Sequence, residues 1–184
     1  MNAAVILIII IVVIAIWAVT AYNGFIKARN SVEEGYSTMD VYLKKRYDLI
    51  PNLVETVKGY AKHEKETLEN LTAARAKVGS AGSVEERAQA ENQLTGALKT
   101  LFAVAEAYPD LKANANFLNL QNQLQQTEQD IANARKYYNA VVKKYNNKCE
   151  MIPSSIVANM FNFKRKPMFE VDSAAERENV SVNF

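Results

Sequence analysis

The sequence has a single cysteine, Cys149, and a single histidine, His63, and this scarcity excludes several kinds of site. One thiol forms no intramolecular disulfide and no paired-cysteine metal site. A zinc-protease helix needs a second histidine four residues after the first, but Thr67 occupies that position. Nucleophilic catalysis by Cys149 would need a base beside it. We therefore expect a protein that is not an enzyme and that holds no metal and no cofactor.

Glycine and proline are also scarce, with six and four residues, and they fall mostly between segments of helical periodicity. No convincing strand is visible, so no glycine-rich phosphate loop follows one. An excess of one charge is lacking too, since 22 Lys and Arg are interspersed with 20 Asp and Glu. Nucleic-acid binding needs a strongly basic face. We therefore expect an all-α chain that binds no nucleic acid.

An uncharged run near the N-terminus, residues 3–21, reads AAVILIIIIVVIAIWAVTA. As a helix it would be about 28 Å long, against about 30 Å for the hydrocarbon core of a bilayer. A cleavable signal peptide is the alternative, but a basic segment before the run is missing and the run is longer than usual. We therefore expect residues 1–24 to be an anchor that crosses the lipid bilayer through residues 3–21.

The charges beside this run predict its orientation. Lys27 and Arg29 follow the run closely, whereas no Lys or Arg precedes it. Basic residues next to a span stay on the cytoplasmic side. Trp17 and Tyr22 lie near the same end, where aromatic rings favour the headgroup level. We expect a single-pass protein with its N-terminus outside and its remaining residues in the cytoplasm.

From residue 32 onward, apolar residues recur at spacings of three and four, which predicts long amphipathic helices. The first is expected over residues 31–78. It should bend at Pro51 rather than reverse there, because proline removes the helical bond to the carbonyl of Tyr47. After a break at residues 79–83, Ser83 followed by Glu86 predicts a capping box.

Two further long helices, over about 83–108 and 111–148, and a short apolar helix within 154–163 complete the pattern. Short loops favour antiparallel neighbours, so we expect a coiled-coil-like antiparallel bundle over residues 25–163. Residues 164–184 are expected to be a flexible tail. Its start is a basic triplet flanked by Phe161, Phe163, Met168 and Phe169. That region is either a docking peptide or a solvated tail that folds loosely back on the bundle.

The part of the first predicted helix nearest the anchor carries an apolar stripe that no sequence-adjacent helix is long enough to cover. The first helix would be about 72 Å long and the second about 36 Å. An exposed stripe marks an interaction surface, so we expect a homo-oligomer, unless residues 152–169 cover the stripe. Arg46 would pair with an acidic residue across the interface or extend to solvent. The candidate self-association seam consists of Val32, Tyr36, Met39, Leu43, Arg46 and Ile50.

Basic residues gather in the last long helix. Cations near a helix C-terminus are favoured by its dipole, and binding of a partner protein is the functional alternative. Lipid binding is disfavoured, because an up-down-up bundle would place this end far from the anchor. The candidate partner-binding cluster consists of Arg135, Lys136, Lys143, Lys144 and Lys148.

The string YDLIPNLVETVKGYAKHE, residues 47–64, resembles the LemA family of bacterial membrane-anchored helical proteins. YPDLKANANF, residues 108–117, agrees as well, and the resemblance covers nearly the whole chain. It implies a span with a short exterior N-terminus and a cytoplasmic helical bundle at the bacterial inner membrane. It implies no established molecular function. Members are often encoded beside membrane proteases, which suggests another membrane protein as a partner.

These observations together predict a non-enzymatic scaffold or adaptor that associates with itself or presents its surface to another membrane protein. The alternative is an accessory or regulatory subunit of a membrane protease or sensor. The sequence does not separate the two.

Overall fold

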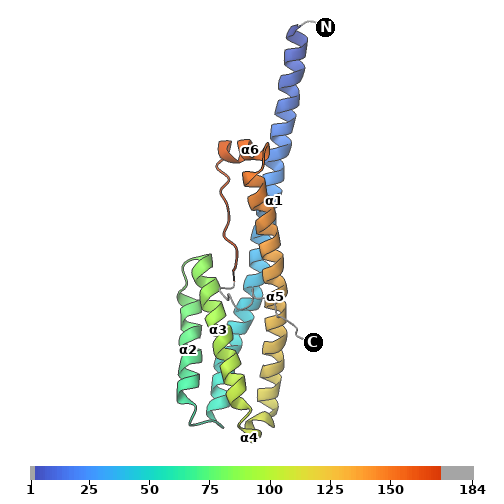
Figure 1. Ribbon diagram of the computed structural model, residues 1–184. Coiled ribbons are helices and arrows are strands. Elements are labelled where there is room, and N and C mark those ends of the chain that lie inside the picture. Colours follow the sequence, from blue (N-terminus) through green and yellow to red (C-terminus); the bar gives the residue numbers. More distant parts are fainter. Residues whose placement is uncertain (1–2, 171–184) are drawn as a thin grey trace, which may run out of the picture. The chain divides into compact units, whose positions relative to one another are not determined.

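The computed structural model describes residues 3–170, and every regular element in that range is an α-helix. This confirms the predicted all-α class. The described chain forms two compact units. Unit 1 contains residues 3–40 and 132–168, and unit 2 contains residues 41–131 and 169–170. The helices are α1 (Ala3–Lys58), α2 (Lys65–Ser80), α3 (Val84–Ala105), α4 (Pro109–Lys112), α5 (Ala115–Glu150) and α6 (Ser154–Met160) (Figure 1).

The first part of α1 is the uncharged run, which is long and apolar enough to cross a membrane. Its side chains from residue 3 to residue 16 are exposed, so nothing in the described chain covers them. An exposed apolar surface of this size is unfavourable in water and suits a lipid environment. The structure therefore contains one N-terminal helix that could span a membrane.

The helix predicted over residues 31–78 is in fact two helices. α1 ends at Lys58, residues 59–64 form tight turns, and α2 begins at Lys65. Within these turns the carbonyl of Val57 accepts hydrogen bonds from the N–H groups of Tyr60 and Ala61, at 3.0 and 2.8 Å. The prediction of one continuous helix was therefore wrong.

Tertiary contacts hold this turn in place. The Tyr108 hydroxyl donates a hydrogen bond to Glu64 Oε1 at 2.8 Å, and this bond raises the pKa of the tyrosine. The Asn114 side-chain amide donates to the Tyr60 hydroxyl, also at 2.8 Å, and Ala61 is buried. Because the partners are far away in sequence, the local spacing of apolar residues does not reveal the turn.

α1 continues through Pro51 instead of reversing there, as predicted. Proline has no N–H, so the carbonyl of Tyr47 loses the donor that a helix normally supplies four residues later. Arg75 from α2 provides a substitute, because its Nε donates to this carbonyl at 3.1 Å. The same guanidinium lies 3.8 Å from the centre of the Tyr47 ring, a cation–π contact. Arg75 therefore offsets part of the cost of a proline inside the helix.

α2 and α3 lie side by side and are joined by residues 81–83 (Figure 1). The hydroxyl of Ser83 accepts a hydrogen bond from the N–H of Glu86 at 3.1 Å. In return, Glu86 Oε2 accepts from the N–H of Gly82 at 2.8 Å. The predicted capping box is therefore present, with its return bond one residue earlier than in the usual motif.

The helix predicted over residues 111–148 begins later than expected and is preceded by the short α4. Pro109 occupies the first turn of α4, where its missing N–H costs nothing. The side chain of Asn114 then accepts a hydrogen bond from the N–H of Phe117 at 3.0 Å. This side-chain cap explains why the long helix α5 starts at Ala115.

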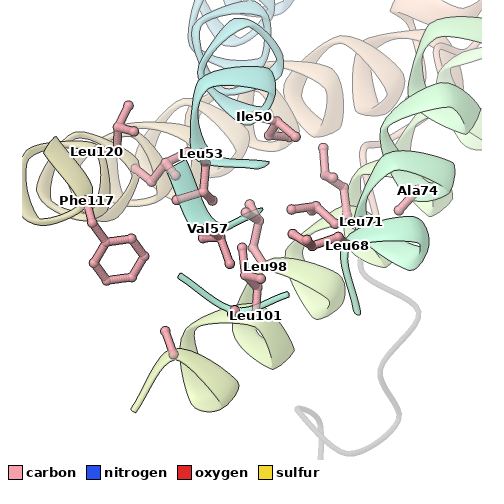
Figure 2. Close-up of a cluster of buried hydrophobic side chains, with 14 of the residues drawn as sticks. Ile50, Leu53, Val57, Leu68, Leu71, Ala74, Leu98, Leu101, Phe117 and Leu120 are labelled. Atoms are coloured by element: carbon pink, nitrogen blue, oxygen red, sulfur yellow. The ribbon is translucent and has the colours of Figure 1, made fainter. Parts of the chain in front are cut away.

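The core of unit 2 is built from apolar side chains of α1, α2, α3 and α5 (Figure 2). Burying each large aliphatic or aromatic side chain contributes roughly 1.5 to 3 kcal/mol. Four helices share one core, so the parts of the predicted apolar stripes that lie in this core have partners within the chain. Labelled members are Ile50, Leu53, Val57, Leu68, Leu71, Ala74, Leu98, Leu101, Phe117 and Leu120.

Candidate functional site

The predicted self-association seam is not an exposed stripe. Five of its members are buried within the chain: Val32, Met39, Leu43, Arg46 and Ile50. The sixth, Tyr36, packs edge-on against Tyr138 of α5, with ring centroids 5.7 Å apart. The exposure that a seam requires is therefore missing. Self-association stays a prediction, and it would need another surface.

In unit 1 the cover for this part of α1 comes from α5. A side chain at Gly35 would have its β-carbon 3.3 Å from Val141 Cγ2 and 3.4 Å from the Tyr137 ring. The two helices approach closely here because glycine presents no side chain. Residues 152–169 were expected to be the cover from within the chain, but at Gly35 and Tyr36 α5 covers α1 instead.

Arg46 is the centre of a buried charged cluster in unit 2. Its Nη1 donates to Thr95 Oγ1 at 2.7 Å and to Glu128 Oε1 at 2.5 Å. Its Nη2 donates to Glu91 Oε2, and to the Glu91 carbonyl at 3.3 Å. Arg87 Nε lies 3.7 Å from the other oxygen of Glu91. Arg46 thus pairs with acidic residues of its own chain, so it neither extends to solvent nor needs a partner subunit.

The chemistry of this charged cluster suits a structural role. The side chains of Arg46 and Glu91 are 0% exposed and that of Glu128 is 34% exposed. Removing one member of a buried ion pair is costly, so such a pair penalises packings that separate the charges. The Thr95 hydroxyl accepts from Arg46 and donates its only proton to the Glu91 carbonyl at 3.1 Å. The charged cluster therefore links α1, α3 and α5 and presents no nucleophile.

The structure places neither His63 nor Cys149 in surroundings that would support catalysis. His63 is exposed in the turn at residues 59–64 of unit 2, whereas Cys149 is half-buried on α5 in unit 1. Burial raises the pKa of the Cys149 thiol, which disfavours the nucleophilic thiolate. Burial also raises the pKa of the neighbouring Tyr145 to about 12. Within residues 3–170, no group of three or more His, Cys, Asp or Glu is placed to hold a metal ion.

Aromatic rings gather where α1 leaves its uncharged run. The buried ring of Phe25 stacks on Phe163 with centroids 4.7 Å apart and an interplanar angle of 9°. Tyr145 approaches Phe25 edge-on at 6.3 Å. Tyr22 lies 4.8 Å from Phe161 and 5.8 Å from Phe163. We call these five residues the aromatic cap. Phe161 and Phe163 already contact Tyr22 and Phe25 of the same chain. These contacts weaken the interpretation of this region as a docking peptide.

The chain after the aromatic cap is held in place as far as the structure describes it. Asn146 donates to the Lys166 carbonyl and accepts from the Lys166 N–H, both at 2.9 Å. The Tyr138 hydroxyl donates to the Pro167 carbonyl at 2.9 Å, and Phe169 is buried. A flexible tail over residues 164–184 stays a prediction, and these contacts are what the structure shows of its first residues. Residues 171–184, which that prediction also covered, lie outside the described residues.

The predicted basic cluster is not one surface. Lys136 and Lys143 are exposed on one face of α5, while Lys148 lies roughly 120 to 140° further round the helix. Lys148 instead points over the Phe25 ring, with Nζ 5.5 Å from its centroid. The C-terminal end of α5 is thus beside the end of the uncharged run, and the expectation that it lies far from the anchor was wrong. The unpredicted reversal at residues 59–64 is the reason, because it adds a helix before α5.

The chain is all-helical over its described residues and has one N-terminal helix that could span a membrane. These two features are those of a helical protein suited to membrane anchoring. A family model described as the LemA family matches residues 35–184. The chain therefore belongs to the LemA family, as its sequence resemblance predicted. This is not known as a family of enzymes.

Curated proteins show the same relationship. The chain is similar to Protein LemA of Metamycoplasma hominis, with 26% identity over 166 residues, covering 88% of this chain and 73% of that protein. It is also similar to the magnetosome proteins MamQ 1 and MamQ 2 of Paramagnetospirillum magneticum. Each is 24% identical over 181 residues, covering 84% of this chain and 66% of the relative. The chain thus spans about two thirds of the length of these magnetosome proteins.

Proposed function

We propose that this protein is a membrane-anchored, non-enzymatic scaffold or adaptor of the LemA type. The observation that carries the proposal is that the buried charged side chains of unit 2 are used to join helices. Arg46, Glu91 and Glu128 hold three helices together, and burial raises the pKa of the Cys149 thiol. What is left for function is the surface that the helices present.

The proposed setting is the cytoplasmic face of the bacterial inner membrane, reached by a single span at residues 3–21. Lys27 and Arg29, directly behind the span, favour this orientation. We further propose that the helices of unit 2 form an antiparallel, coiled-coil-like bundle. The short connections at residues 59–64 and 81–83 and the shared core support that arrangement.

The partner of such a scaffold is either a second copy of the chain or another membrane protein. Since five of the six predicted seam residues are buried, self-association would use other parts of the surface. An accessory or regulatory subunit of a membrane protease or sensor would give a different pattern of neighbours from a self-associating scaffold. Each of these two patterns of neighbours differs from that of a chain with no binding role.

Proximity labelling separates these outcomes. A labelling enzyme is fused to the C-terminus, and a differently tagged second copy is expressed in the same cells. The matched control joins residues 1–24 directly to the labelling enzyme, so that it has the same anchor without the helical units. We expect the full chain to enrich either the second copy or one recurrent membrane protein over this control. Identical labelling by the two fusions would contradict the proposed function.

A further inference from the structure

Large apolar side chains are exposed together around α6. In the rest of residues 41–170, the exposed ones occur singly, which is normal for a protein surface. Around α6 five occur within eleven consecutive residues, a concentration that needs an explanation. They are Met151 (61% exposed), Ile152 (84%), Ile156 (57%), Met160 (64%) and Phe161 (50%).

Apolar side chains lie on both sides of α6, the exposed side as well as the buried one. Ile156 and Met160 are four residues apart on α6 and so share one side, while Met151, Ile152 and Phe161 flank the helix. On the opposite side Val157 and Ala158 are buried in unit 1. One side of α6 therefore packs on the protein while the other presents apolar side chains outward.

The position of α6 indicates what covers that outward side. A cavity of about 310 Å³ is lined by Trp17, Thr20 and Ala21 of α1 together with Pro153 and Ser154 at the start of α6. The start of α6 is therefore level with the last turn or so of the uncharged run. Figure 1 shows α6 lying crosswise to α1. If α1 crosses a bilayer, a helix crosswise to it at this level lies along the membrane surface.

The surrounding charge is complementary to an anionic bilayer. Residues 22–31 and 143–168 contain eight Lys or Arg but one acidic residue, Glu150. Glu150 pairs with Arg165 at 3.0 Å. Anionic phospholipids attract such basic segments at the membrane surface, by about 1 kcal/mol per cation. Exposed apolar side chains beside an excess of cations are the combination that interfacial membrane-binding helices use.

We propose that α6 and its flanking residues 151–153 and 161 form a second membrane contact, which inserts into the headgroup region of an anionic phospholipid bilayer beside the span. The proposal rests on the anchoring of residues 3–21, but not on the scaffold role. The contact would hold unit 1 in one orientation against the membrane, which a single span leaves free to rotate.

Depth-dependent fluorescence quenching of the full chain tests this contact. The protein carries Cys149→Ser and Ile156→Cys with an environment-sensitive label, and is reconstituted into phosphatidylcholine vesicles with or without phosphatidylglycerol. Matched labels at Ile10, in the uncharged run, and at Leu118, an exposed residue of unit 2, report the anchor and the aqueous phase. With phosphatidylglycerol we expect about fivefold less quenching by iodide at residue 156 than at residue 118, together with quenching by lipids labelled near the headgroup.

The controls separate the possible failures. If residue 156 is as accessible to iodide as residue 118 while residue 10 is quenched by lipid, the second contact is refuted and the anchor stands. If residue 10 is also accessible to iodide, the anchor itself is refuted. A photo-crosslinker at residue 156 that captures a protein and no lipid in native membranes would also overturn the proposal. A last variant combines Ile152→Ser, Ile156→Ser and Met160→Ser and carries its label at residue 155. Compared with the same label on the parent protein, its label should become accessible to iodide without loss of helix content.

Discussion

Arg46→Met is expected to lower the free energy of unfolding by about 3 to 5 kcal/mol, because it leaves the buried carboxylate of Glu91 without its main cation. Methionine has a similar length and is apolar, so the packing volume changes little. The Glu128 side chain is 34% exposed, so water can solvate its carboxylate once Arg46 is gone. The unpaired carboxylate of Glu91 is therefore the main cause of the lost stability. Urea unfolding of the detergent-solubilised full chain, followed by helical circular dichroism, measures the change.

Two further variants identify the cause of that loss. Lys44→Met removes an exposed ion pair with Asp48, which is worth about 0 to 1 kcal/mol. Replacing Arg46, Glu91 and Glu128 together by Met, Leu and Leu removes all three charges and should recover most of the stability. The structural role of the charged cluster would be contradicted if Arg46→Met were as mild as Lys44→Met. It would also be contradicted if the triple variant were no more stable than the single one.

Phe25→Ala is expected to destabilise unit 1 by about 3 to 5 kcal/mol, because it removes a fully buried ring from the aromatic cap. The Phe163 ring would lose its stacking partner, and the chain that follows it would open more often. Trypsin cuts after Lys164 and Arg165 only when this part of the chain is locally unfolded. A loss of 3 kcal/mol raises that open population, and with it the cleavage rate, by about a hundredfold.

The matched control for this experiment is Tyr137→Ala, which removes from unit 1 an aromatic ring that is 46% exposed and lies outside the aromatic cap. Its cleavage rate after residues 164 and 165 should stay close to that of the unmodified protein. Equal cleavage of Phe25→Ala and the unmodified protein would show that the aromatic cap does not hold the returning chain.

The features that were predictable from sequence are those that neighbouring residues determine. The uncharged run, the Ser83 cap and the passage of α1 through Pro51 each depend on a few adjacent side chains. The turn at residues 59–64 was missed, because the contacts that hold it come from Tyr108 and Asn114. The sequence did carry a weak signal, since Glu64 and Thr67 interrupt the apolar stripe just after a glycine.

Missing this turn had consequences for the candidate sites. With one reversal fewer, the end of α5 was expected far from the anchor, and lipid binding was set aside for that reason. The contact between Lys148 and Phe25 places this end beside the uncharged run instead. The role of Arg46 was also hidden, because its partners Glu91 and Glu128 lie on helices whose register the sequence does not specify. A charge on each of two apolar stripes was the available signal.

A phosphatase that is active only in the periplasm, fused to the C-terminus, tests the anchored cytoplasmic setting on which the proposed function depends. Alkaline extraction of the membranes is the companion measurement, because it separates a spanning chain from one that is bound peripherally. With Lys27 and Arg29 behind the span, we expect an inactive phosphatase on a protein that stays in the membrane fraction. High phosphatase activity, or release of the protein by alkali, would contradict a cytoplasmic scaffold held by residues 3–21.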